Sequence, residues 1–150
     1  MSLKDQLAQD LKEAMKTKDQ AALRAIRAIK SAILIAETAE GRGDATLDAA
    51  EEMQLLTRQA KQRRDSIQQF RDNGRDDLAA KEEEELAIIE RYLPAQLSEA
   101  DLAAELKALI AEMGTVTVKD MGKIMGAATQ RLAGRADNKA IAATVKALLA

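Results

Sequence analysis

Residues 120–137, DMGKIMGAATQRLAGRAD, combine glycines with cations in a way that suits phosphate binding. The stretch opens with the pair Gly122-Lys123, and a phosphate-binding loop of the P-loop type has the pattern Gly-x-x-x-x-Gly-Lys-Ser/Thr. The position of its first glycine holds Thr117, and the position of its hydroxyl residue holds Ile124. The sequence therefore argues against a nucleoside triphosphate site of this kind.

The positive charges around this stretch form a second candidate for phosphate binding. Lys119 and Lys123 lie four residues apart and share a helix face. We call the whole set the basic edge: Lys119, Lys123, Arg131, Arg135 and Lys139. Lysine and arginine release counterions from a nucleic-acid backbone, which favours binding. The alternative is a solvated surface with cations near helix C-termini, and the residues alone leave both interpretations open.

Two glycines inside an expected helix need a reason, because each costs about 1 kcal/mol relative to alanine. Gly122 and Gly126 lie four residues apart on one face. We expect another helix of the chain to approach this face closely. The alternative is the close approach of a partner backbone.

The other charged clusters lie in an acidic middle segment. Residues 44–93 hold 8 basic and 13 acidic residues, whereas residues 115–150 hold 6 and 2. We expect the basic cluster RQAKQRRD at 58–65 to pair with carboxylates of the same chain. The run EEEE at 82–85 points around a helix rather than toward one metal ion, so a solvated face is expected.

The missing residue types limit the chemistry. With no His and no Cys, the chain lacks the ligands of Cys/His zinc sites and the usual Ser-His and Cys-His nucleophile pairs. One Phe, one Tyr and no Trp leave little for stacking on bases. We therefore expect no metal, no cofactor and no catalytic residue. The lack of a long apolar run and of a targeting signal predicts a cytoplasmic protein that does not enter a membrane.

The elements that must position these residues all follow helical periodicity, which predicts an all-α protein. We expect a helical hairpin or bundle domain over 1–93 and a three-helix domain over 94–150, divided at LPAQLS by the proline. The expected helix starts are Ser2 with Asp5, Asp19, Thr46, Asp76 or Asp77, Ser98 with Asp101, Thr117 with Asp120, and Asp137. The expected stops are 41–43, Asn73-Gly74, Pro94, Gly114 and Gly134.

Two blocks of sequence resemble the GatB/YqeY family, in the order of its small stand-alone YqeY-like proteins. They are KQRRDSIQQFRDNGRDDLAAKEEEELAIIERYLPAQLSEADL at 61–102 and KDMGKIMGAATQRLAGRAD at 119–137. The resemblance implies a C-terminal domain similar to the tail of the B subunit of the glutamine-dependent aspartyl/glutamyl-tRNA amidotransferase, which helps to hold tRNA. The resemblance also implies that the basic edge contacts nucleic acid. It implies a structural role for Gly122, Gly134 and Asp137.

The leading hypothesis is a non-catalytic tRNA-binding or tRNA-enzyme accessory protein. Its expected partners are tRNA and, beside it, tRNA-charging or amidotransferase proteins. One alternative is a protein–protein adaptor that uses the helical hairpins and the acidic middle. Another is a component of carbon–nitrogen ligase activity with glutamine as amido-N-donor, as the resemblance implies.

Overall fold

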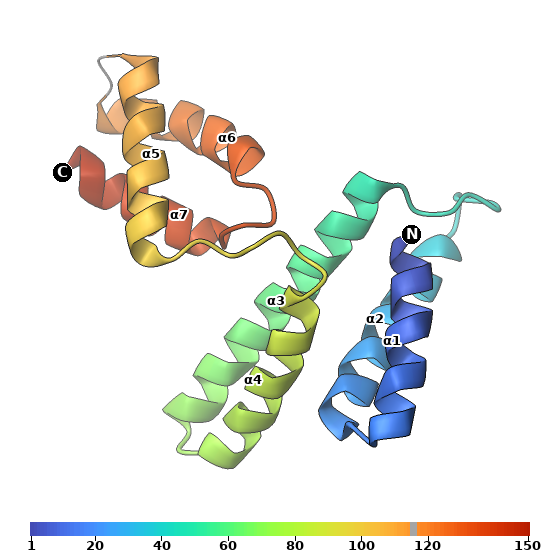
Figure 1. The fold of residues 1–150 in the computed structure, drawn as a ribbon. Helices are drawn as coiled ribbons and strands as arrows, with labels where there is room; N and C mark the ends of the chain where they lie inside the picture. Colours follow the sequence, from blue (N-terminus) through green and yellow to red (C-terminus); the bar gives the residue numbers. More distant parts are fainter. Residues whose placement is uncertain (115–116) are drawn as a thin grey trace. The chain divides into compact units, whose positions relative to one another are not determined.

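The computed structural model shows an all-α protein and confirms the predicted fold class (Figure 1). It describes residues 1–114 and 117–150, and within them every regular element is helical. The elements are α1 (Leu3–Thr17), α2 (Gln20–Glu37), α3 (Ala49–Asp72), α4 (Asp76–Glu90), α5 (Glu99–Met113), the 3-10 turn η1 (Val118–Asp120), α6 (Met121–Arg131) and α7 (Asn138–Leu149). None of the helices in these ranges has the length and apolar character needed to span a bilayer. The chain divides into two compact units, Met1–Leu93 and Pro94–Ala150.

The N-terminal unit consists of two helical hairpins that share one core. Helix α1 packs on α2, α3 packs on α4, and α2 contacts both helices of the second hairpin (Figure 1). Apolar residues at helical spacing on α2 supply the centre of this core, and Ile26 and Ile29 are almost fully buried there. Burying one such side chain contributes about 1.5 to 3 kcal/mol. The amphipathic spacing of α2 thus fixes where both hairpins meet.

The first two helix starts lie where the residue types predict them. The hydroxyl of Ser2 accepts from the backbone N–H of Asp5, and the Asp5 carboxylate accepts from the Ser2 N–H, which completes a capping box. The Asp19 carboxylate accepts from the N–H of Ala22 at 3.1 Å. Both predictions are confirmed because each cap depends on residues within one helical turn.

Helix α2 ends earlier than predicted. It stops at Glu37, four residues before Gly41, and Thr38 is its C-cap. The carbonyl of Leu34 accepts from the N–H of Thr38 at 3.0 Å and from its hydroxyl at 2.8 Å, and the same hydroxyl lies 3.3 Å from the carbonyl of Ile35 in the last turn. The glycines therefore belong to the connecting loop rather than to the helix end.

The predicted cap at Thr46 is wrong, because Asp48 begins α3. Asp48 and Glu51 form a reciprocal capping box, with both hydrogen bonds at 2.8 Å. Arg42 donates to both oxygens of Glu51 and also to the carbonyl of Thr46. This arginine holds Glu51 at the third helical position and thereby selects Asp48 as the cap.

The turn between α3 and α4 agrees with the prediction. Asn73 is the C-cap of α3, and Gly74 has a φ of 70°, in the left-handed region that glycine tolerates. Helix α4 begins at Asp76, as expected, and ends at Glu90, four residues before Pro94.

The C-terminal unit packs α5, α6 and α7 around a small core of its own. Leu106, Ile124 and Val145, one from each helix, are fully buried at its centre. Ser98 accepts from the N–H of Asp101 at 3.1 Å, which confirms this cap. Gly114 ends α5 with a φ of 85°, also as predicted.

Candidate nucleic-acid interface

The first two lysines of the basic edge are positioned by a cap at Thr117. The Asp120 carboxylate accepts from the Thr117 N–H at 2.8 Å, and the Thr117 hydroxyl accepts from the Lys119 N–H at 3.3 Å. This predicted capping box forms the start of η1, and α6 follows directly at Met121. Lys119 lies in η1 and Lys123 is the third residue of α6, so both side chains stand exposed at the N-terminal end of that helix.

The turn after α6 positions the other end of the basic edge. Gly134 has a φ of 75°, which lets the chain reverse before α7. The Leu97 N–H donates to the Arg135 carbonyl at 2.9 Å, and the Gln96 side chain donates to the Gly134 carbonyl at 2.6 Å. The segment before α5 thus holds this turn in place. Arg135 is half-buried there, and the exposed Lys139 follows in the first turn of α7.

Asp137 is the N-cap of α7 by position, but its side chain does not cap the helix. Its backbone is extended, and its carbonyl accepts the first helical bond from Ile141 at 3.0 Å. The carboxylate makes no capping hydrogen bond, so this part of the prediction is wrong.

Arg131 differs from the other cations of the basic edge because it has an internal partner. Its guanidinium donates to the Glu112 carboxylate at 2.6 Å and joins α6 to α5. This hydrogen bond holds the pKa of Glu112 below its ordinary value. Within the part of the chain that the structure describes, no ion pair links a carboxylate to Lys119, Lys123, Arg135 or Lys139. Nothing in the sequence spacing indicated the pairing of Arg131 with Glu112, nineteen residues away.

The expected close packing at the two helical glycines is wrong. Gly122 and Gly126 are both exposed on α6. A Cβ atom built on either would meet no described atom within 4 Å. No helix of this unit therefore requires glycine at these positions, and the backbone of α6 is open to solvent beside Lys123.

The charged clusters of the N-terminal unit form ion pairs with each other. Arg64, from the cluster at 58–65, contacts Glu90 at 3.3 Å, and its neighbour Arg63 contacts Glu82 and Glu85 at 3.4 Å. The expected pairing within the chain is confirmed for these arginines. The expected solvated face at 82–85 holds for the exposed Glu84 and the half-exposed Glu83, which still contact Arg24 and Arg71. It is wrong for Glu82 and Glu85, whose largely covered side chains contact Arg63, and Glu85 also contacts Arg24. No group of acidic residues in the described ranges has the geometry of a metal site.

Comparison with known proteins gives consistent matches. A family model described as Yqey-like protein matches residues 4–149. Three fungal relatives carry the name Altered inheritance of mitochondria protein 41, mitochondrial. The relative from Candida glabrata is 41% identical over 58% of this chain and 47% of its own length. The relative from Saccharomyces cerevisiae strain YJM789 is 41% identical over 71% and 57%, and that from Vanderwaltozyma polyspora is 36% identical over 77% and 64%. The chain thus spans roughly half to two thirds of the length of these relatives.

Proposed function

The chain belongs to the family of YqeY-like proteins, and from this premise we propose that it is a non-catalytic accessory protein that binds tRNA phosphates through the basic edge. The observation that carries the proposal is the position of three exposed lysines. Lys119 and Lys123 stand at the N-terminal end of α6, and Lys139 is the second residue of α7.

Cations at these positions do not serve helix stability. The N-terminal end of a helix carries a partial positive charge, so lysine there is unfavourable, whereas a cation at the C-terminal end is stabilising. Arg131, the last residue of α6, fits the interpretation of a surface cation that stabilises a helix end. Lys123 and Lys139 do not fit it. An anion would be attracted by these lysines and, at the start of α7, also by N–H groups of the first turn that the Asp137 side chain does not cap.

The open glycine face gives room for a nucleic-acid backbone. Gly122 and Gly126 flank Lys123 and have no side chain that would hold a ribose-phosphate chain away from α6. RNA helices are recognised mainly through their shape, their phosphates and their 2′-hydroxyl groups. A surface with lysines and glycines and few aromatic residues suits that mode of recognition better than stacking on single bases.

Two further parts of the proposal concern context. We propose that the protein acts beside tRNA-charging or amidotransferase proteins, in keeping with its likeness to the tail of the amidotransferase B subunit. The expected cytoplasmic location also stays a proposal, since the relatives described above carry the word mitochondrial in their names.

The test is a titration of the full chain with tRNA at several salt concentrations. We expect the logarithm of the binding constant to fall linearly with the logarithm of the salt concentration. The slope should be about 0.7 to 0.9 per phosphate contact. The charge reversal K123E/K139E should weaken binding and reduce the salt slope.

The matched control is K107E/K146E, which changes the net charge equally on exposed lysines of α5 and α7 outside the basic edge. This variant should bind almost as the parent does. Absence of tRNA binding by the parent at low salt, or equal weakening by the two variants, would contradict the proposal.

A further inference from the structure

The contact between Arg131 and Glu112 sets one cation of the basic edge apart from the others. The Arg131 guanidinium donates to the Glu112 carboxylate at 2.6 Å through one of its terminal nitrogens. The side chain of Arg131 is 39% exposed and that of Glu112 is 58% exposed. Arginine carries five N–H donors in a planar fork that matches both carboxylates and phosphates. A tRNA phosphate would therefore meet Glu112 as a competitor for this guanidinium.

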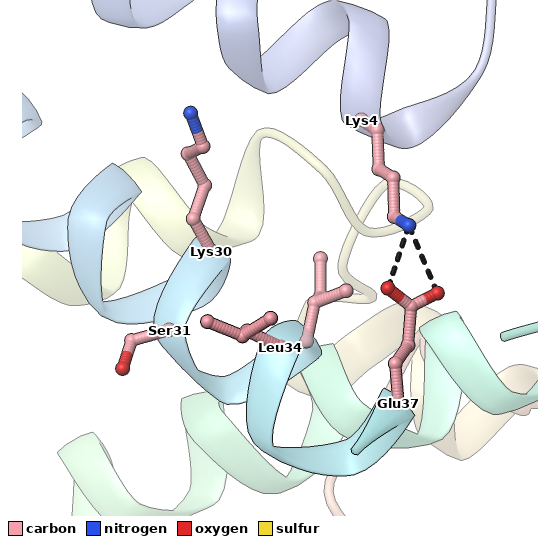
Figure 2. Close-up of a pocket in the computed structure, with 6 residues that line it drawn as sticks. Lys4, Lys30, Ser31, Leu34 and Glu37 are labelled. Atoms are coloured by element: carbon pink, nitrogen blue, oxygen red, sulfur yellow. Dashed lines mark hydrogen bonds and ion pairs between the residues drawn. The ribbon is translucent and has the colours of Figure 1, made fainter. Parts of the chain in front are cut away.

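An ion pair of the N-terminal unit shows what a contact built into the packing looks like. Figure 2 shows Lys4 of α1 donating to both oxygens of Glu37 on α2, at 2.6 and 2.9 Å. The Glu37 side chain is only 15% exposed, and it also accepts from the Leu47 N–H at 3.1 Å. Among the residues that the structure describes, the more exposed Glu112 carboxylate has Arg131 as its one hydrogen-bond partner. The contact of Arg131 with Glu112 is therefore the easier of the two to open.

The position of Glu112 within its helix also needs a reason. Glu112 is the second-to-last residue of α5, where the partial negative charge of the helix end disfavours a carboxylate. Helix stability therefore gives no reason for an acid at this position. The hydrogen bond and the charge of Glu112, with a smaller contribution from the charge of Glu105, raise the pKa of Arg131 above its ordinary value. Helix α5 thus presents negative charge to this one cation of the basic edge.

We propose, on the basis of the function proposed above, that Glu112 is an autoinhibitory residue of the tRNA-binding surface because it withholds Arg131 from phosphate. In the parent protein, the other four cations of the basic edge make the phosphate contacts. A phosphate that approached Arg131 would come close to the Glu112 carboxylate, and like charges at short range repel each other. Removal of Glu112 frees the guanidinium and also removes this repulsion. The basic edge then gains one phosphate contact.

The test is a tRNA titration of E112A beside the parent, at several salt concentrations. E112A should raise the binding constant about 1.5- to 5-fold at low salt, a factor that corresponds to the strength of an exposed ion pair. The slope of the logarithm of the binding constant against the logarithm of the salt concentration should steepen by about 0.7 to 0.9, which is the contribution of one added phosphate contact. The melting temperature should stay close to that of the parent, because the pair is exposed. A contact that only joins α5 to α6 would instead lower the melting temperature and leave the salt slope unchanged.

Two controls separate the release of Arg131 from a general loss of negative charge. E99A removes an exposed carboxylate from the first turn of the same helix, and Glu99 forms no ion pair within the described residues. E99A should leave the salt slope at the value of the parent. In an R131Q background, E112A should likewise leave the slope unchanged, since the guanidinium is then missing. Equal steepening by E112A in both backgrounds would assign the effect to charge alone and overturn the proposal.

The same titrations distinguish the role of Glu112 from the proposed function. A parent that binds tRNA with a steep salt dependence, together with an E112A variant that binds as the parent does, would overturn the role of Glu112 and leave the proposed function standing. If neither the parent nor E112A binds tRNA at low salt, the proposed function itself fails, and the role of Glu112 fails with it.

Discussion

The two units of this protein differ in the surroundings of their basic side chains. In the N-terminal unit, arginines reach between helices: Arg24 of α2 lies 3.1 Å from Glu85 of α4, and Arg63 of α3 lies 3.4 Å from the same carboxylate. In the C-terminal unit, Lys123 and Lys139 stand exposed at helix N-termini, with no ion pair in the described residues. A cation that faces a carboxylate on a neighbouring helix becomes part of the packing. A cation without such a neighbour stays available to a partner.

Among the variants that test this difference between the units, we predict the largest change in stability at Glu85. Its side chain is 12% exposed and lies between two arginines. Among the residues that the structure describes, none forms a hydrogen bond with the buried Nε of Arg63, and the Glu85 carboxylate lies 3.4 Å from it. E85A should therefore lower the free energy of unfolding by about 1 to 3 kcal/mol, because it removes the carboxylate beside the buried Nε of Arg63 and leaves Arg63 with Glu82 as its one remaining ion-pair partner among the described residues. Urea denaturation of the full chain measures this.

The neighbouring residue provides the control for that prediction. Glu84 contacts the same Arg24 at 3.4 Å, but its side chain is 59% exposed. Exposed ion pairs contribute about 0.2 to 1 kcal/mol, so E84A should change stability much less. Equal effects of E84A and E85A would show that burial does not decide how much these carboxylates contribute.

A smaller effect is expected at the glycines of α6, where stability and binding should change in opposite directions. No atom of the described residues outside α6 lies within 4 Å of a methyl group at position 126, so G126A should stabilise the protein by about 1 kcal/mol, because alanine favours the helix. The same variant should weaken tRNA binding, since a methyl group then stands where the proposed backbone approach occurs. Denaturation and tRNA titration of one variant test both halves. A variant that is more stable and binds equally well would exclude the glycine face from the contact.

Local features of the fold were predictable from the sequence because their causes lie within a few residues. Ser2 with Asp5, Asp19, and Thr117 with Asp120 all cap helices as expected. In each case a short polar side chain satisfies an N–H group of the next turn. The error at Thr46 has a longer-range cause, because Arg42 fixes Glu51 from nine residues away and moves the cap to Asp48.

The candidate site was predictable in its residue types but not in their surroundings. The basic edge could be named from composition and spacing. The pairing of Arg131 with Glu112 depends on how α5 and α6 pack, and no local pattern encodes it. The same holds for the open face at Gly122 and Gly126, since glycine in a helix is compatible both with close packing and with exposure. Tertiary packing alone decides which cations and which glycines face solvent.

Acidification should have the smallest effect on stability. It should act at the loop between α2 and α3 in the N-terminal unit. Hydrogen bonds from Arg42 and from the Asp48 N–H lower the pKa of Glu51 from 4.5 to about 2. A carboxyl whose folded pKa lies below its unfolded value stabilises the fold above the unfolded pKa, and this contribution is lost as pH falls toward the folded pKa. E51Q should thus be less stable than the parent near neutral pH, and the difference in melting temperature should shrink between pH 4.5 and about 2. A difference that stays constant over this range would mean that ionisation of Glu51 contributes nothing to stability.

In the C-terminal unit, the Arg131 guanidinium likewise holds the pKa of Glu112 below its ordinary value. E112Q measured in parallel therefore shows whether acid destabilises one unit more than the other.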